Sequence, residues 1–158
     1  MRCLPLLALV ACGHDAEPLP GSCRTLDASP QVGVTHATIK IRDDAQVPAS
    51  QMIVLDAARN EVEPFQIVVA GPVTDLQVAK GPLTSTAGDV LDTDHIRLFQ
   101  EGRYYVRYAS STEGAPGYWP DPLIPDVDAY AGEPRNAFVH FDIAAGQTRA
   151  VWADIHVP

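Results

Sequence analysis

Residues 151–157 read VWADIHV, and this stretch decides the fold. Val151, Ala153 and Ile155 alternate with Trp152 and Asp154, so the apolar side chains share one face of an extended chain, in which successive side chains point to opposite sides. An amphipathic helix would instead need apolar residues three and four positions apart. The stretch therefore predicts a β-strand with one face on a hydrophobic core.

The same period of two recurs from residue 34 onward. Ala37, Ile39 and Ile41 are predicted to share one face of a strand, as are Phe65 and Ile67. The other alternating segments are residues 76–78, 95–99 (HIRLF), 104–108 and 139–143. Turn-forming residues separate the segments, at Gly71-Pro72, Gly81-Pro82, Gly88-Asp89, Gly102 and Gly146.

Short strands without intervening amphipathic helices favour antiparallel pairing over a βαβ arrangement. Residues 49–60 fit either a helical turn or a strand followed by a bend. We therefore predict an all-β fold over residues 32–158, an antiparallel β-sandwich of the immunoglobulin-like or jelly-roll-like kind.

The composition is that of one globular domain. A chain of 158 residues with 46% hydrophobic and 20% charged residues is long enough to bury a core. The net charge of −9 is not interrupted by a cluster of Lys and Arg, which excludes nucleic acid and anionic lipid headgroups as expected partners. No phosphate-binding Gly loop, G-x-S-x-G or H-E-x-x-H motif occurs, so we expect no cofactor and no catalytic metal.

Residues 1–11 have the layout of a secretory signal. A minimal positive start precedes an apolar run, residues 3–10 (CLPLLALV), which is too short to span a membrane. The sequence LVAC, ending at Cys12, resembles the bacterial lipobox, which implies lipidation of Cys12 and, with Gly13 next, an outer-membrane or cell-surface destination. The alternatives are an ordinary signal cleaved elsewhere and a mis-assigned start codon. We expect an exported protein that meets the membrane only through its lipid.

Residues 12–31 are predicted to be a flexible tether, because they are rich in Pro, Gly, Ser and Asp and lack an apolar period. His14 lies alone in this linker and is not expected to bind a metal. Cys23 would be the one remaining thiol and has no evident His partner. If Cys12 is not lipidated, Cys12 and Cys23 are free to pair in the export compartment.

Three segments together resemble a known family. Residues 57–69 (AARNEVEPFQIVV), 119–125 (WPDPLIP) and 144–158 (AAGQTRAVWADIHVP) are similar in order and spacing to proteins related to glycoside hydrolase family 123, which include the group catalogued as domain of unknown function 4091. The resemblance covers nearly all of residues 34–158. It places residues 119–125 in a Pro-rich loop.

The resemblance implies an N-terminal β-sandwich that precedes a separate barrel carrying a catalytic Asp-Glu pair. The printed chain stops at Pro158, before that barrel and before the Gly-Tyr-Gly hairpin that usually completes the sandwich. It is therefore expected to be truncated, incomplete at its C-terminal edge and, as it stands, not an enzyme.

Acidic residues are the first candidates for chemistry within the chain. Glu61 and Glu63 share a strand face about 7 Å apart, which suits an inverting glycosidase pair in spacing only, since one face presents both to the same side of a substrate. We favour a surface or loop-bracing role for Glu61. Asp121, Asp126 and Asp128 offer oxygen ligands for calcium but fit no standard loop, so we expect no metal there.

Aromatic residues are the second candidates. Tyr118, Trp119 and Tyr130 flank the Pro-rich segment, where they would either stack on sugar rings or, with the prolines, pack as a structural plug against the sandwich or against the barrel domain. We prefer the structural packing. The remaining histidines are expected to be solvated residues on separate strands: His36, His95, His140 and His156.

Two functions follow as hypotheses. The first is a non-catalytic accessory module of a glycan-processing surface lipoprotein, which packs against a catalytic barrel and therefore exposes an apolar patch near Trp119 or on the C-terminal strand. The second is a free-standing carbohydrate-binding lipoprotein with a polar-rimmed aromatic site.

Overall fold

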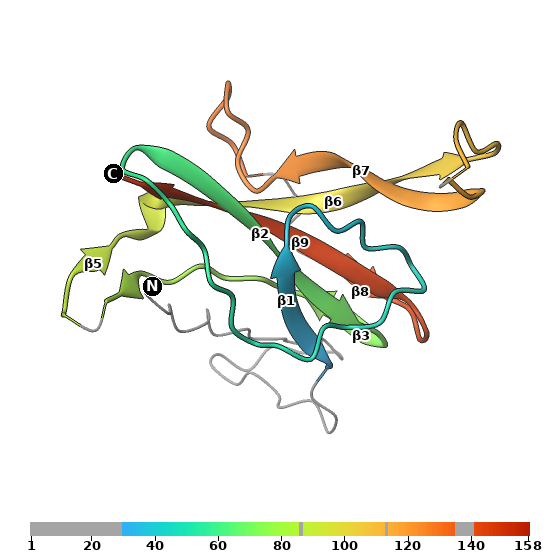
Figure 1. The fold of residues 1–158 in the computed structure, drawn as a ribbon, viewed down its shortest axis with the longest axis horizontal. Helices are drawn as coiled ribbons and strands as arrows, with labels where there is room; N and C mark the ends of the chain where they lie inside the picture. Colours follow the sequence, from blue (N-terminus) through green and yellow to red (C-terminus); the bar gives the residue numbers. More distant parts are fainter. Residues whose placement is uncertain (1–29, 86, 113, 135–140) are drawn as a thin grey trace.

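The alternating stretch lies in the central strand of the structure. In this computed structural model β9 (Thr148–Val157) pairs with β2 (Glu61–Ala70) along its whole length and with the first half of β6 (Ile96–Val106). β1 (Val32–His36) and β7 (Gly117–Pro125) form the edges of an antiparallel sheet with the order β1-β2-β9-β6-β7 (Figure 1). The structure describes residues 30–85, 87–112, 114–134 and 141–158.

Two small antiparallel sheets complete the fold. β3 (Val73–Leu76) pairs with β8 (Phe141–Ile143), and β4 (Leu83–Thr84) pairs with β5 (Val90–Leu91). The described ranges contain no α-helix, only a 3₁₀ turn, η1 (Thr93–His95), and residues 49–60 form no helical turn. The predicted all-β, antiparallel sandwich is therefore confirmed.

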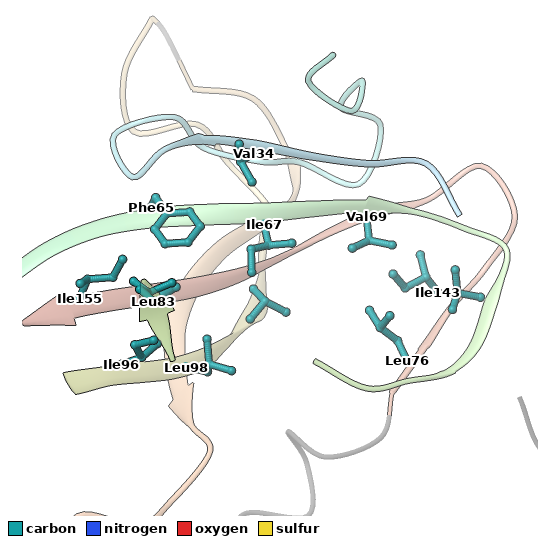
Figure 2. Close-up of a cluster of buried hydrophobic side chains, with 13 residues drawn as sticks. Val34, Phe65, Ile67, Val69, Leu76, Leu83, Ile96, Leu98, Ile143 and Ile155 are labelled. Atoms are coloured by element: carbon teal, nitrogen blue, oxygen red, sulfur yellow. The ribbon is translucent and has the colours of Figure 1, made fainter. Parts of the chain in front are cut away.

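The hydrophobic core lies between the large sheet and the two small ones. Its side chains come from the faces that the alternation predicts, on β2, β6 and β9, and meet residues of β3, β4 and β8 (Figure 2). Those labelled in Figure 2 are Val34, Phe65, Ile67, Val69, Leu76, Leu83, Ile96, Leu98, Ile143 and Ile155. This apolar set occupies one side of the large sheet. We call the opposite side of the large sheet the second face.

Part of the second face is covered by the segment between β1 and β2. Ile41 packs there against Val68 and Ala150, with Ala45 and Val47 beside them. This second, smaller cluster fixes residues 37–47 against the sheet.

The strand predicted for residues 34–42 is shorter than expected, since β1 ends at His36 and a turn follows. Gln66 explains the ending: its side-chain amide donates to the carbonyls of His36, Ala37 and Ile39. Because these contacts turn the chain out of the sheet, Ile39 is half exposed, while Ile41 is buried in the smaller cluster on the second face and not in the core.

Residues 119–125, expected as a Pro-rich loop, belong to β7. The strand lies at the edge of the sheet, where proline is tolerated because one side of an edge strand has no ladder to complete. The prolines therefore did not interrupt the strand as the sequence interpretation assumed.

The turn predicted at Gly102 is also wrong, because β6 continues through it with a register shift between Glu101 and Arg103. A Cβ at Gly102 would lie 2.6 Å from Cγ of Pro122 on the neighbouring strand. The absence of a side chain at Gly102 thus allows β6 and β7 to approach each other closely at the register shift.

We expect Gly102→Ala to lower the free energy of unfolding by about 2 kcal/mol, the usual cost of overpacking. The matched control is Gly81→Ala, because a Cβ at Gly81 meets nothing within 4 Å. Urea denaturation of both variants measures the difference. Equal urea midpoints for the two variants would show that β7 moves to accommodate the added methyl group without loss of stability.

Candidate functional site

A small pocket opens on the second face, with a volume of about 140 Å³. The sheet contributes Gln66, Trp152 and Glu101 to its lining. The segment after β1 contributes Ala37, Ile39 and Lys40, and β7 contributes Pro120, Asp121 and Leu123. The pocket thus joins residues from five separate parts of the chain: the segment after β1 and the strands β2, β6, β7 and β9.

Gln66 lies at the base of this arrangement. It is paired with Trp152, which is itself paired with Phe99 on β6, so the three residues form one row across the second face. Gln66 is 1% exposed, and its Nε2 donates to the carbonyl oxygens of Ile39 at 2.7 Å and of His36 and Ala37 at 3.1 Å each. Its Oε1 is buried and has no hydrogen-bond partner.

Glu101 is the buried carboxyl of the pocket, with 8% of its surface exposed. Burial raises the pKa of this carboxyl from 4.5 to about 7, and the positive charge of Lys40 acts in the opposite direction. About half of the Glu101 side chains therefore carry a proton at neutral pH, so the group both donates and accepts hydrogen bonds there.

The segment that forms the rim of the pocket is held by ion pairs. Asp43 binds the guanidinium groups of Arg103 and of Arg149, the latter at 2.9 Å between Oδ1 and Nη1. Burial and the nearby Arg103 lower the pKa of Arg149, and Asp43 opposes both. The hydroxyl of Thr148 also donates to the carbonyl of Ala45 at 2.7 Å. The pocket wall is therefore fixed to β6 and β9.

The far half of the β6–β7 hairpin has a different character. β6 pairs with β9 only up to Gln100. Beyond Gln100, β7 is the one strand partner of β6 in the described sheet. Figure 1 shows this end of the hairpin extending away from the other strands. We call this part the tyrosine arm, after four residues with exposed fractions of 49% to 85%: Tyr104, Tyr105, Tyr108 and Tyr118.

The three aromatic residues predicted as contacts do not form one cluster. Tyr118 meets the ring of Tyr105 edge-on, with 5.1 Å between centroids. Trp119 faces the other side of the ribbon, because it pairs with Tyr104; its Nε1 donates to the carbonyl of Ala115. Tyr130 is fully exposed in the loop beyond the opposite end of β7. Two arginines complete the aromatic contacts: Arg103 stacks on Tyr118 at 5.0 Å and Arg42 on Trp119 at 4.8 Å.

The acidic candidates have separate roles. Oε2 of Glu61 accepts a hydrogen bond from the amide of Ala58 at 2.7 Å, which is the expected loop-bracing contact. Asp126 pairs with Lys80 at 3.7 Å, and Asp128 accepts hydrogen bonds from the backbone of the turn that follows it. Within the described ranges no three His, Cys, Asp or Glu side chains gather as metal ligands.

Sequence interpretation missed a histidine pair. His95 and His156 stack with 5.4 Å between ring centroids, and their Nδ1 atoms lie 3.2 Å apart. Nε2 of His156 lies 3.1 Å from Oδ1 of Asn60. The histidines are 61 residues apart in the chain, so only the pairing of β6 with β9 brings them together. His36 lies exposed at the end of β1.

Several predictions fall outside the described residues: the signal of residues 1–11, the lipidated Cys12, the tether up to residue 29, Cys23 and His140. Among the residues that are described, no helix is long and apolar enough to traverse a bilayer. No family model matches the chain, and no curated protein matches its sequence.

Proposed function

We propose that this chain is a non-catalytic accessory β-sandwich module of an exported, lipid-anchored glycan-processing protein, which packs against a catalytic barrel through its tyrosine arm. The observation that carries the proposal is the exposure of Tyr104, Tyr105 and Tyr118 on a two-stranded ribbon and of Tyr108 just beyond it. Tyrosines are over-represented in protein interfaces, and a two-stranded ribbon with few contacts to the rest of the fold, here those of Arg42 and Asp43, is weakly stabilised in water. A partner that covers the arm resolves both features.

The size of the pocket supports the non-catalytic part. Glu101 and Asp121 line it from neighbouring strands, as two carboxyls would in a glycosidase. However, about 140 Å³ is well below the roughly 300–1,000 Å³ of ordinary ligand pockets and leaves no space for the sugars on both sides of a scissile bond. We therefore expect no hydrolysis of chromogenic N-acetylhexosaminides by the isolated chain. Turnover that disappears in Glu101→Gln would refute the non-catalytic assignment.

Docking is tested with the barrel itself. Reading the DNA downstream of the codon for Pro158 should reveal a barrel-coding frame, and the expressed barrel should bind this chain in calorimetric titrations. Because central interface tyrosines contribute about 2 kcal/mol or more, Tyr104→Ser combined with Tyr105→Ser should weaken binding about 30-fold or more. Tyr130→Ser is the matched control, since Tyr130 is exposed but lies outside the arm. A double variant that binds as tightly as the parent chain would contradict the proposal.

The second candidate function, a free-standing carbohydrate-binding lipoprotein, is favoured by the pocket on the second face. Calorimetric titration with the barrel separates the two functions, because the free-standing carbohydrate-binding protein requires no barrel. The pocket itself can be assigned a ligand chemistry without choosing between them.

A further inference from the structure

We infer that the pocket between residues 37–40, the second face and β7 binds one neutral, ring-sized polyhydroxyl unit, such as a single sugar ring. This inference goes beyond the docking role of the tyrosine arm and does not depend on it, since the pocket lies within the described chain. Four features of the pocket favour such a ligand: an unpaired buried acceptor, the balance of charge, the volume and the rigidity of the wall.

The unpaired acceptor is Oε1 of Gln66. The orientation of this amide follows from its surroundings, because three carbonyl oxygens attract Nε2 and would repel an oxygen in its place. A buried acceptor without a partner costs free energy, about 1–3 kcal/mol in typical proteins. Oε1 is itself buried, so a ligand hydroxyl reaches it only with a small shift of the Gln66 amide; a hydroxyl donated there would remove that cost, and this favours a ligand with O–H donors.

The charges of the pocket favour a neutral ligand. Lys40 contributes one positive charge, Asp121 one negative charge, and Glu101 a carboxyl that is about half protonated at neutral pH. The charges of Lys40 and Asp121 cancel and Glu101 adds only part of a negative charge, so neither a cation nor an anion gains a large Coulomb energy. They do provide donors and acceptors together, which is what the hydroxyls of a polyol need, since each hydroxyl both donates and accepts.

The apolar walls and the volume favour a ring. Trp152, Ile39 and Leu123 line the pocket beside the polar groups, and a sugar ring has C–H surface to pack against such walls. The volume of about 140 Å³ is several times the roughly 30 Å³ occupied by one water molecule. The space therefore takes one ring and excludes an extended chain.

The wall is held in place before any ligand binds. Gln66 fixes the turn at residues 37–39, and the ion pairs of Asp43 with Arg103 and Arg149 fix the segment that follows. A preformed site avoids the entropic cost of ordering a loop on binding, which is a large cost for a weak ligand.

The test is a titration of the ¹⁵N-labelled chain with glucose, N-acetylglucosamine, their methyl glycosides and myo-inositol. We expect saturable shifts of the Gln66 side-chain amide and the Trp152 indole signals, with a Kd on the order of 1 mM for the best of these ligands. Methyl glycosides that bind as well as free sugars indicate the end unit of a glycan, whereas a preference for myo-inositol indicates a free polyol. Sodium acetate and methylamine are the charged probes and should not saturate the site.

Two variants localise the binding. Glu101→Leu and, independently, Asp121→Ala should each weaken the best ligand about tenfold, the effect of losing one buried hydrogen bond. Asp121 is exposed, so Asp121→Ala remains informative if Glu101→Leu fails to fold. Asp56→Asn, at an exposed position outside the pocket, is the control and should bind as the parent chain does. Absence of saturable shifts for every neutral probe, or an affinity of both pocket variants equal to that of the parent chain, would overturn the inference, whatever the barrel experiment gives.

Discussion

Replacement of Glu101 by Gln is expected to increase the free energy of unfolding at pH 8 by about 3 kcal/mol. Burial raises the pKa of this carboxyl from 4.5 to about 7, so the folded protein holds the proton more tightly than the unfolded chain does. The stabilisation by this proton is complete below about pH 4.5 and is lost as the pH rises through 7. Gln resembles the protonated group at every pH and does not lose this contribution.

Urea denaturation at pH 5 and pH 8 separates the effect from a general stabilisation. The free energies of unfolding of the two proteins should differ little at pH 5 and most at pH 8. At pH 8 the parent chain has to ionise the buried Glu101 carboxyl in the folded state, whereas the variant has no proton to lose there. Glu133→Gln is the matched control, since Glu133 is exposed and the change is chemically the same. A parallel pH response of Glu101→Gln and the parent protein would mean that the carboxyl is not held in a desolvated site.

The second large effect is expected for Gln66→Leu, which should lower the free energy of unfolding by about 3 kcal/mol. Leu fills a similar volume but has no donor for the carbonyls of His36, Ala37 and Ile39. The carbonyl of His36 keeps the amide of Ile39 as a donor, but those of Ala37 and Ile39 must find water or remain unpaired, and the turn after β1 loses its attachment to the sheet. Hydrogen exchange should accelerate at the amide of Ile39, which donates to the carbonyl of His36 in the same turn.

Gln100→Leu is the control for this experiment. Gln100 lies on the adjacent strand but one, is partly buried where Gln66 is fully buried, and makes no side-chain hydrogen bond to another described residue. Its replacement should change stability by less than about 0.5 kcal/mol, as is usual for positions without a specific contact. If Gln66→Leu is equally mild, the turn is held by the hydrophobic contacts of Ile41 and not by the amide.

Much of the strand pattern could be predicted from the sequence, because the core-facing residues depend on local alternation. Phe65, Ile67, Ile96, Leu98 and Ile155 all point into the core as their period of two indicates. Such positions are determined within a few residues along the chain.

The errors arose where a distant residue decided the local structure. The chain leaves the sheet after His36 because of Gln66, thirty positions later, and β6 passes through Gly102 because Pro122 lies against it. Residues 119–125 are compatible with a strand because their place is at the edge. Alternation and turn propensity contain no information about such partners.

The pocket could not be predicted for the same reason. Gln66, Glu101 and Trp152 are each ordinary polar or aromatic residues on the faces opposite to the core pattern, and only the register of β2, β9 and β6 brings them together. One signal was present: Phe99 and Trp152 place large apolar groups on the strand faces opposite to the predicted core. Aromatic residues on the polar side of paired strands indicate that this side is also covered.

The prolines of β7 determine how another protein can approach the outer border of the large sheet. Pro120, Pro122 and Pro125 have no amide hydrogen, so a further strand laid alongside β7 would find gaps in its ladder. Growth of the sheet by strand addition, between copies of this chain or onto a foreign edge, is therefore disfavoured at this border. Any molecule that engages the β6–β7 hairpin has to do so through side chains on its flat surfaces, where affinity depends on shape and ring contacts and not on shared backbone hydrogen bonds.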